Sequence, residues 1–150
     1  NSAAVTNPEL VAALQSAFGR QCTVVAVDAV GRSANAWEVV TRSGTCATGL
    51  DVVDWLAQVE ERGAGEILLT SWDRDGTREG YDLPLLKAAA SRIRIPIIAS
   101  GGADSATHMA EGLSAGASAV LAASIFHDGD ATVDTIKELL SQEGISVRRC

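Results

Sequence analysis

Four short apolar runs recur along the chain, over residues 23–27, 66–70, 96–99 and 119–122. None of them alternates apolar with polar residues. Uninterrupted apolar runs of this length are typical of strands that are buried on both faces of a parallel sheet. The pattern therefore predicts four strands of that kind.

The segments between these runs carry the apolar spacing of amphipathic helices, with capping residues at their ends. The first expected helix covers residues 8–18 and ends at Gly19. A short helical turn is expected after Ala123-Ser124. Further helices are expected from Leu50 to Gly63, from Asp82 with Pro84 in the first turn, between Ser105 and Gly116, and from Thr132 onward.

The resulting order is one helix followed by four strand–helix units. The interval after the first strand has room for a hairpin over 36–42 with a turn at 43–45. Repeated strand–helix units imply a parallel sheet with right-handed crossovers. Two architectures fit: an open doubly wound sheet, or half of a (β/α)8 barrel, since a complete barrel needs about 250 residues. At 150 residues the chain is expected to be a single domain, 1–150.

The composition restricts the class of protein. Hydrophobic residues make up 47% and charged residues 21%, as in soluble domains that form a core. The net charge of −7 disfavours a nucleic-acid-binding surface. No apolar run approaches the roughly 18 residues of a membrane span, and no signal pattern opens the chain. We expect a cytoplasmic protein, and the start at Asn1 instead of Met suggests a piece of a longer one.

The cysteines and histidines suggest neither a disulfide framework nor a metal site. Cys22, Cys46 and Cys150 are odd in number, far apart and outside any metal-ligand spacing. With only His108 and His127 as histidine ligands, a zinc site is not expected. No cofactor is expected either.

Polar residues and glycines gather where the predicted strands end. Ligands bind at this edge in both candidate architectures, because the carboxyl ends of parallel strands lie together. The residues concerned are Asp28 after the first strand, Ser71, Asp73, Arg74, Asp75 and Gly76 after the second, Ser100, Gly101 and Gly102 after the third, and Ala123 and Ser124 after the fourth.

Two of these strand ends suggest an anion site. Glycines such as Gly101 and Gly102 let the backbone approach a ligand and point its amides at an anion. The turn at Ala123-Ser124 would aim helix N-terminal amides at the same place. Loops after the last two strands of a barrel commonly hold phosphate. The alternative is that Gly101-Gly102 is only a tight turn.

Two carboxylates at the same edge are candidates for acid–base chemistry. Asp75 lies in a glycine-punctuated loop, where a carboxylate can accept or donate a proton. Asp28 closes a valine-rich strand and would face the same opening. The alternatives are a surface ion pair made by Arg74 with its acidic neighbours, and a capping role for Asp28.

Several blocks resemble one family in order: 66–77 (EILLTSWDRDGT), 80–82 (GYD), 97–102 (IIASGG) and 121–127 (LAASIFH). They closely resemble the cyclase subunit of imidazole glycerol phosphate synthase, a (β/α)8-barrel enzyme of histidine biosynthesis. The segment 80–82 favours this cyclase over the related isomerase barrel of the same pathway. The resemblance implies a substrate with two phosphates, and ammonia delivered by a glutaminase subunit.

The resemblance also implies roles for single residues. Asp75 corresponds to a catalytic aspartate, and Asp28 to an active-site acid of secondary importance. Glu66, otherwise a solvated strand-end residue, would belong to a charged ring at the ammonia entrance. One phosphate or substrate site would include Ser71, Gly76, Ser100, Gly101, Gly102, Ala123 and Ser124, and the other Asn1 and Ser2.

The departures from the family suggest half of an enzyme. The family's other catalytic aspartate lies on its first strand, before the position of Asn1, and Trp72 replaces a smaller residue. We expect the chain to be inactive alone and to need a complementary N-terminal half-barrel. The alternative is a non-catalytic, self-associating half-barrel, a homodimer that retains a phosphate site.

Overall fold

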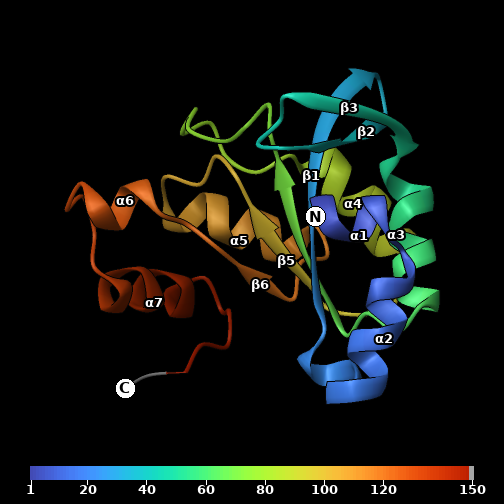
Figure 1. The fold of residues 1–150 in the computed structure, drawn as a ribbon. Helices are drawn as coiled ribbons and strands as arrows, with labels where there is room; N and C mark the ends of the chain where they lie inside the picture. The colour runs from blue at the N-terminus through green and yellow to red at the C-terminus, as the bar shows by residue number, and fades with distance from the viewer. Residues whose placement is uncertain (149–150) are drawn as a thin grey trace.

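The computed structural model describes residues 1–148 as a six-stranded sheet with helices around it (Figure 1). Cys150 lies outside the described residues. The strands are β1 (Val24–Ser33), β2 (Ala36–Thr41), β3 (Cys46–Asp51), β4 (Glu66–Ser71), β5 (Ile97–Ser100) and β6 (Ala119–Val120). The helices are α1 (Ser2–Thr6), α2 (Glu9–Phe18), α3 (Val52–Glu61), α4 (Leu83–Arg92), α5 (Ala106–Ser114), α6 (Ser124–His127) and α7 (Val133–Gln142), with a 3-10 turn at Arg20–Cys22.

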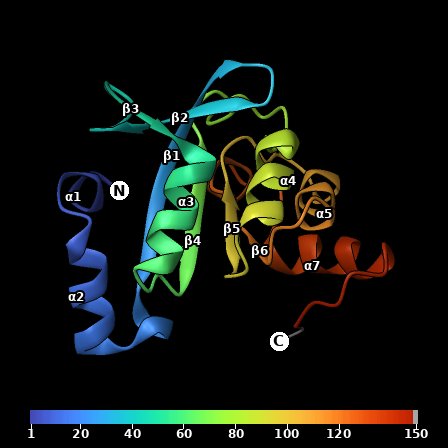
Figure 2. The same ribbon diagram turned by 90° about the vertical axis from the view of Figure 1, so that its right-hand side faces the viewer.

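The strand order distinguishes the two candidate architectures. Strands β1, β4, β5 and β6 are parallel and adjacent in the order in which the chain visits them. Helix α3 contacts α4, and α4 contacts α5, so the crossover helices form one row on one side of the sheet (Figure 2). A doubly wound sheet reverses its strand order and carries helices on both faces. The fold is therefore consistent with half of a (β/α)8 barrel, and the sheet is open.

The two faces of the sheet differ in burial. The outer face packs on the helices through Val25, Val27, Ala29, Ile67, Leu69, Ile97 and Ala99, all buried. On the inner face the intervening side chains Ala26, Leu68 and Ile98 are half-buried, and Val24 is 50% exposed. The prediction of strands buried on both faces is wrong for the inner face, because no complete layer of residues 1–148 covers it.

Strand β1 is longer than predicted. It continues beyond Asp28 to Ser33, because this second half pairs antiparallel with β2, with Asp28 opposite Val40. The expected hairpin is present, with β2 turning into β3. Leu50, expected in a helix, lies in β3, since Asp51 caps α3. Strand β6 spans two residues, fewer than predicted.

The predicted helix starts are confirmed by their capping bonds. Asp82 accepts a hydrogen bond from the Leu85 amide at 3.0 Å, at the start of α4. Ser105 accepts one from the His108 amide at 3.1 Å, at the start of α5. Thr132 caps α7 in the same way. Such caps satisfy amides that have no partner within the helix.

Candidate functional site

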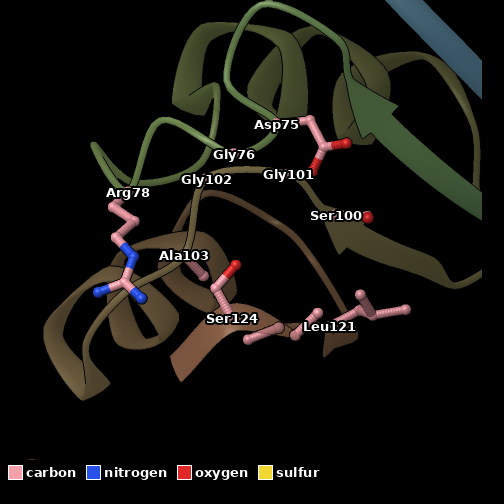
Figure 3. Close-up of a pocket in the computed structure, with 11 residues that line it drawn as sticks. Asp75, Gly76, Arg78, Ser100, Gly101, Gly102, Ala103, Leu121 and Ser124 are labelled. Carbon is pink, nitrogen blue, oxygen red and sulfur yellow. The ribbon is translucent and has the colours of Figure 1, made fainter. Parts of the chain in front are cut away.

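A pocket lies at the carboxyl ends of β4, β5 and β6 (Figure 3). Three segments form its walls: Asp75, Gly76 and Arg78 after β4, residues 100–103 from the last residue of β5 onward, and residues 121–124 after β6. The sequence predicted that polar residues and glycines of these segments would meet at one edge. Of the phosphate-site residues expected there, Gly76, Ser100, Gly101, Gly102, Ala123 and Ser124 all line this pocket.

Glycines allow the walls to approach each other. Gly101 has φ +97°, and a Cβ there would lie 2.7 Å from the Ser71 carbonyl oxygen. Gly102 has φ +95°, and its Cβ would lie 2.4 Å from the carbonyl oxygen of Gly80. The Gly80 amide donates to the Gly102 carbonyl at 2.8 Å, which ties the two loops together. The Gly101-Gly102 turn is thus tight and also forms a pocket wall.

The third wall is the expected turn at Ala123-Ser124. The amides of Phe126 and His127 both donate to the Ala123 carbonyl at 3.0 Å, which begins the short helix α6. Ser124 is the first residue of α6 and faces the pocket with Ala103 opposite (Figure 3).

The three charged residues after β4 have different environments. Asp73 accepts a hydrogen bond from the Gly31 amide at 2.6 Å, which fastens this loop to the end of β1. Arg74 pairs with Glu79 of the same loop at 3.2 Å. Asp75 lines the pocket, and its carboxylate makes no hydrogen bond or ion pair with residues 1–148. Of the three, Asp75 is therefore the one available to a ligand.

Asp28 lies in a second cluster on β1. Its register places it opposite Thr70, which is itself opposite Ser100, so the three form a row across the inner face. The Asn1 side-chain amide donates to the Asp28 carboxylate at 2.7 Å and to the Val40 carbonyl at 2.7 Å. These bonds orient the Asp28 carboxylate, which lies within β1 but level with the carboxyl ends of β4 and β5.

Ser2 is the other N-terminal residue expected at a phosphate site. Its hydroxyl accepts a hydrogen bond from the amide of Arg42, at the β2–β3 turn, at 3.2 Å. Asn1 and Ser2, at the start of α1, therefore contact Asp28 and the β2–β3 turn and do not line the glycine-lined pocket. The structure thus separates the two expected phosphate sites.

Two predicted site residues lie away from the pocket. The Ser71 side chain is buried on the outer face, where its hydroxyl is 3.4 Å from the Asp82 carboxylate. A side-chain contact of Ser71 with a ligand in the pocket does not fit this orientation. Glu66 begins β4 opposite Val24, at the far end of the sheet from the pocket.

Arg78 is a pocket residue that the sequence did not single out. Its guanidinium pairs with Asp104 at 3.3 Å, with Asp130 at 3.0 Å, and also with Asp128. The hydrogen bond with Asp130 is the main reason that the pKa of Arg78 is raised above its ordinary value. Its acidic partners lie 26 to 52 residues away, so no local pattern signals the cluster.

The comparisons with known proteins agree with this geometry. Residues 1–132 match the family model described as histidine biosynthesis protein. The chain belongs to this family. It is 53% identical over 148 residues to imidazole glycerol phosphate synthase subunit HisF of Gluconacetobacter diazotrophicus, which covers 99% of this chain and 57% of that protein. Subunits HisF of two Caulobacter vibrioides strains are also 53% identical, over 150 residues and 58% of their length.

The resemblance to the cyclase family is thus confirmed. The chain spans little more than half the length of the curated HisF proteins it matches. Within residues 1–148, no helix is both long and apolar enough to cross a membrane. Over the same residues, no group of three His, Cys, Asp or Glu side chains could hold a metal ion.

Proposed function

We propose that residues 1–150 form one half-barrel domain that contributes a phosphate site and an acid–base carboxylate to imidazole ring closure in histidine biosynthesis. The observation that carries this is the glycine-lined pocket at the ends of β4, β5 and β6, beside two aspartates on the same sheet edge. The relatives are named as subunits of an imidazole glycerol phosphate synthase, whose product contains a phosphate. Backbone amides at glycine turns suit such a group.

The two aspartates have different positions relative to this pocket. Asp75 lines it directly, so a bound phosphate would be its neighbour. Asp28 lies on the inner face between the pocket and the Asn1-Ser2 cluster, where the middle of a substrate with two phosphates would lie. Each carboxylate can transfer a proton to or from a substrate held there. We propose both as acid–base candidates, Asp75 as the catalytic aspartate and Asp28 as an acid of secondary importance.

The remaining parts of the reaction extend this proposal. The substrate carries two phosphates, ammonia is the nitrogen donor, and a glutaminase subunit supplies the ammonia from the end of the sheet where Glu66 lies. We expect no useful turnover by the 150-residue chain alone, because these residues do not include the family's other catalytic aspartate. Loss of one positioned proton-transfer group lowers a rate by about 10²–10⁴-fold. The strand ends of the N-terminal half-barrel would also help to position the substrate, and the 150-residue chain alone does not supply them.

The test uses the chain combined with the N-terminal half of a HisF relative, with ammonia as the nitrogen donor. We expect ring closure in the combined sample, and a loss of about 10²-fold or more in kcat for Asp28→Asn and for Asp75→Asn. Phosphate affinity should change little in Asp28→Asn. Of the two variants, the one that loses more kcat while its KM changes less identifies the proton-transfer residue.

Asp73→Asn is the matched control. It makes the same change in the same loop, and its amide oxygen can still accept the hydrogen bond from Gly31. Turnover should stay near that of the unmodified chain. Unchanged turnover in both Asp28→Asn and Asp75→Asn would remove these carboxylates from the mechanism.

A second candidate function is a non-catalytic half-barrel that associates with a second copy of itself. The open sheet favours it, because among residues 1–148 Val24–Val27 of β1 pair only with β4, and β6 pairs only with β5. Unpaired strand edges are templates for another chain.

A further inference from the structure

Arg78 joins three loops that are distant in sequence. It belongs to the loop after β4, whereas Asp104 follows β5, and Asp128 and Asp130 follow α6. Arg78 Nη1 lies 3.3 Å from the Asp104 carboxylate and 3.0 Å from that of Asp130, and Nη2 contacts Asp128. We call Arg78 and these three aspartates the Arg78 cluster.

Two of the loops joined by the Arg78 cluster are walls of the pocket, and the third follows α6, whose first residue, Ser124, lines the pocket. Arg78 lies two residues after Gly76, and Asp104 lies two residues after Gly102. Asp128 directly follows α6, the helix that begins at Ser124. Figure 3 shows Arg78 at one side of the pocket glycines and Asp75 at the other. The cluster therefore restrains each wall close to the residues that line the pocket.

The members of the cluster are held in place by further contacts. The Asp104 amide donates to His108 Nδ1 at 3.3 Å, which anchors this aspartate to α5. Arg78 has φ +62°, a left-handed conformation that non-glycine residues adopt only where the surroundings favour it. A single exposed ion pair contributes little to folding stability, whereas several charges in one network can contribute more.

We propose that Arg78 is a positioning residue that holds the three walls of the pocket at the spacing needed to bind a phosphate group. This inference rests on the proposed phosphate site. In this role the three carboxylates favour phosphate binding because they hold Arg78 in place, although they bring negative charge close to the phosphate. In the competing role, Arg78 contacts the phosphate directly. The three carboxylates would then compete with the phosphate for the Arg78 guanidinium.

The test is a titration of the 150-residue chain with inorganic phosphate, in which calorimetry or NMR measures binding. We expect Arg78→Gln to weaken phosphate binding by about five- to tenfold, the effect of losing a small charge network. Arg78→Lys should recover part of the loss. The double variant Asp128→Asn/Asp130→Asn should also weaken binding, although it removes two negative charges.

Arg74→Gln is the matched control. Arg74 lies in the same loop with a similar exposure, 41% against 39% for the Arg78 side chain, but its partner Glu79 belongs to the same loop. Its loss removes the same charge without releasing a wall. Phosphate affinity should therefore change by less than about twofold.

The acidic variants decide between the two roles. Tighter phosphate binding by Asp128→Asn/Asp130→Asn would overturn the positioning role, since it would show that the carboxylates compete with the anion for Arg78.

Hydrogen exchange without phosphate separates this inference from the proposed site. Arg78→Gln should accelerate exchange in segments 100–105 and 123–132, and unchanged exchange there would overturn the positioning role. A wild-type chain that binds no phosphate, with faster exchange in the variant, would overturn the phosphate site instead.

Discussion

At the scale of single residues, Gly102 decides how closely the loops after β4 and β5 can approach. It has φ +95°, and a Cβ would lie 2.4 Å from the Gly80 carbonyl oxygen. Gly102→Ala should lower the free energy of unfolding by about 2–5 kcal/mol, the sum of left-handed strain and a backbone clash. Urea unfolding measures this loss, and phosphate binding should weaken with it.

Gly144 provides the control for that substitution. It has φ +80°, and a Cβ at this position would meet no atom within 4 Å, so Gly144→Ala carries the backbone strain without the clash. It should lower the free energy of unfolding by only about 1–2 kcal/mol. Equal losses for the two variants would show that contact with the loop before α4 is unimportant.

At the scale of elements, Tyr81 attaches the short strand β6 to the start of α4. Its hydroxyl donates to the Leu121 carbonyl at 2.8 Å, and burial raises the pKa of the phenol, which keeps the donor proton in place. Tyr81→Phe leaves that carbonyl without its partner and should lower the free energy of unfolding by about 1–3 kcal/mol. Exchange protection in β6 should fall with it.

Ser91→Ala is the comparison for Tyr81→Phe. The Ser91 hydroxyl also donates to a backbone carbonyl at 2.8 Å, that of Ala88, but at an exposed position. Its loss should change the free energy of unfolding by less than about 0.5 kcal/mol. A Tyr81→Phe variant as stable as Ser91→Ala would contradict a structural role for the hydroxyl.

At the scale of the whole molecule, the half-covered sheet predicts association. Val24 is 50% exposed on the inner face, at the part of β1 that, within the described residues 1–148, pairs only with β4. Light scattering under reducing conditions should show a dimer of the chain alone, and a 1:1 complex once the N-terminal half of a HisF relative is added. Val24→Lys should weaken both the dimer and the 1:1 complex, whereas Leu139→Lys, on α7, should weaken neither.

A monomer at all concentrations, with and without the added half, would contradict this prediction. A dimer that persists after the half is added would favour the self-associating, non-catalytic role. The 1:1 complex would make the enzyme-half proposal the one to assay for ring closure.

Local patterns in the sequence determined the elements and the edge at which they meet. Apolar runs indicated the four parallel strands, and Asp82, Ser105 and Thr132 marked helix starts that the capping bonds confirm. Parallel strands place all their carboxyl ends at one edge, so the meeting of Gly76, Gly102 and Ser124 followed from topology alone. The blocks 66–77 and 97–102 were specific enough to indicate the family, which the comparisons show.

Only the tertiary structure decided how single side chains are directed and which distant charges meet. Asp28 lies within β1 and not at its end because β2 extends the strand, and Ser71 turns outward because side chains alternate along β4. The Arg78 cluster joins residues up to 52 positions apart. Spacing in the sequence encodes periodicity and caps, which are local, whereas such pairings depend on strand register and on the paths of the loops.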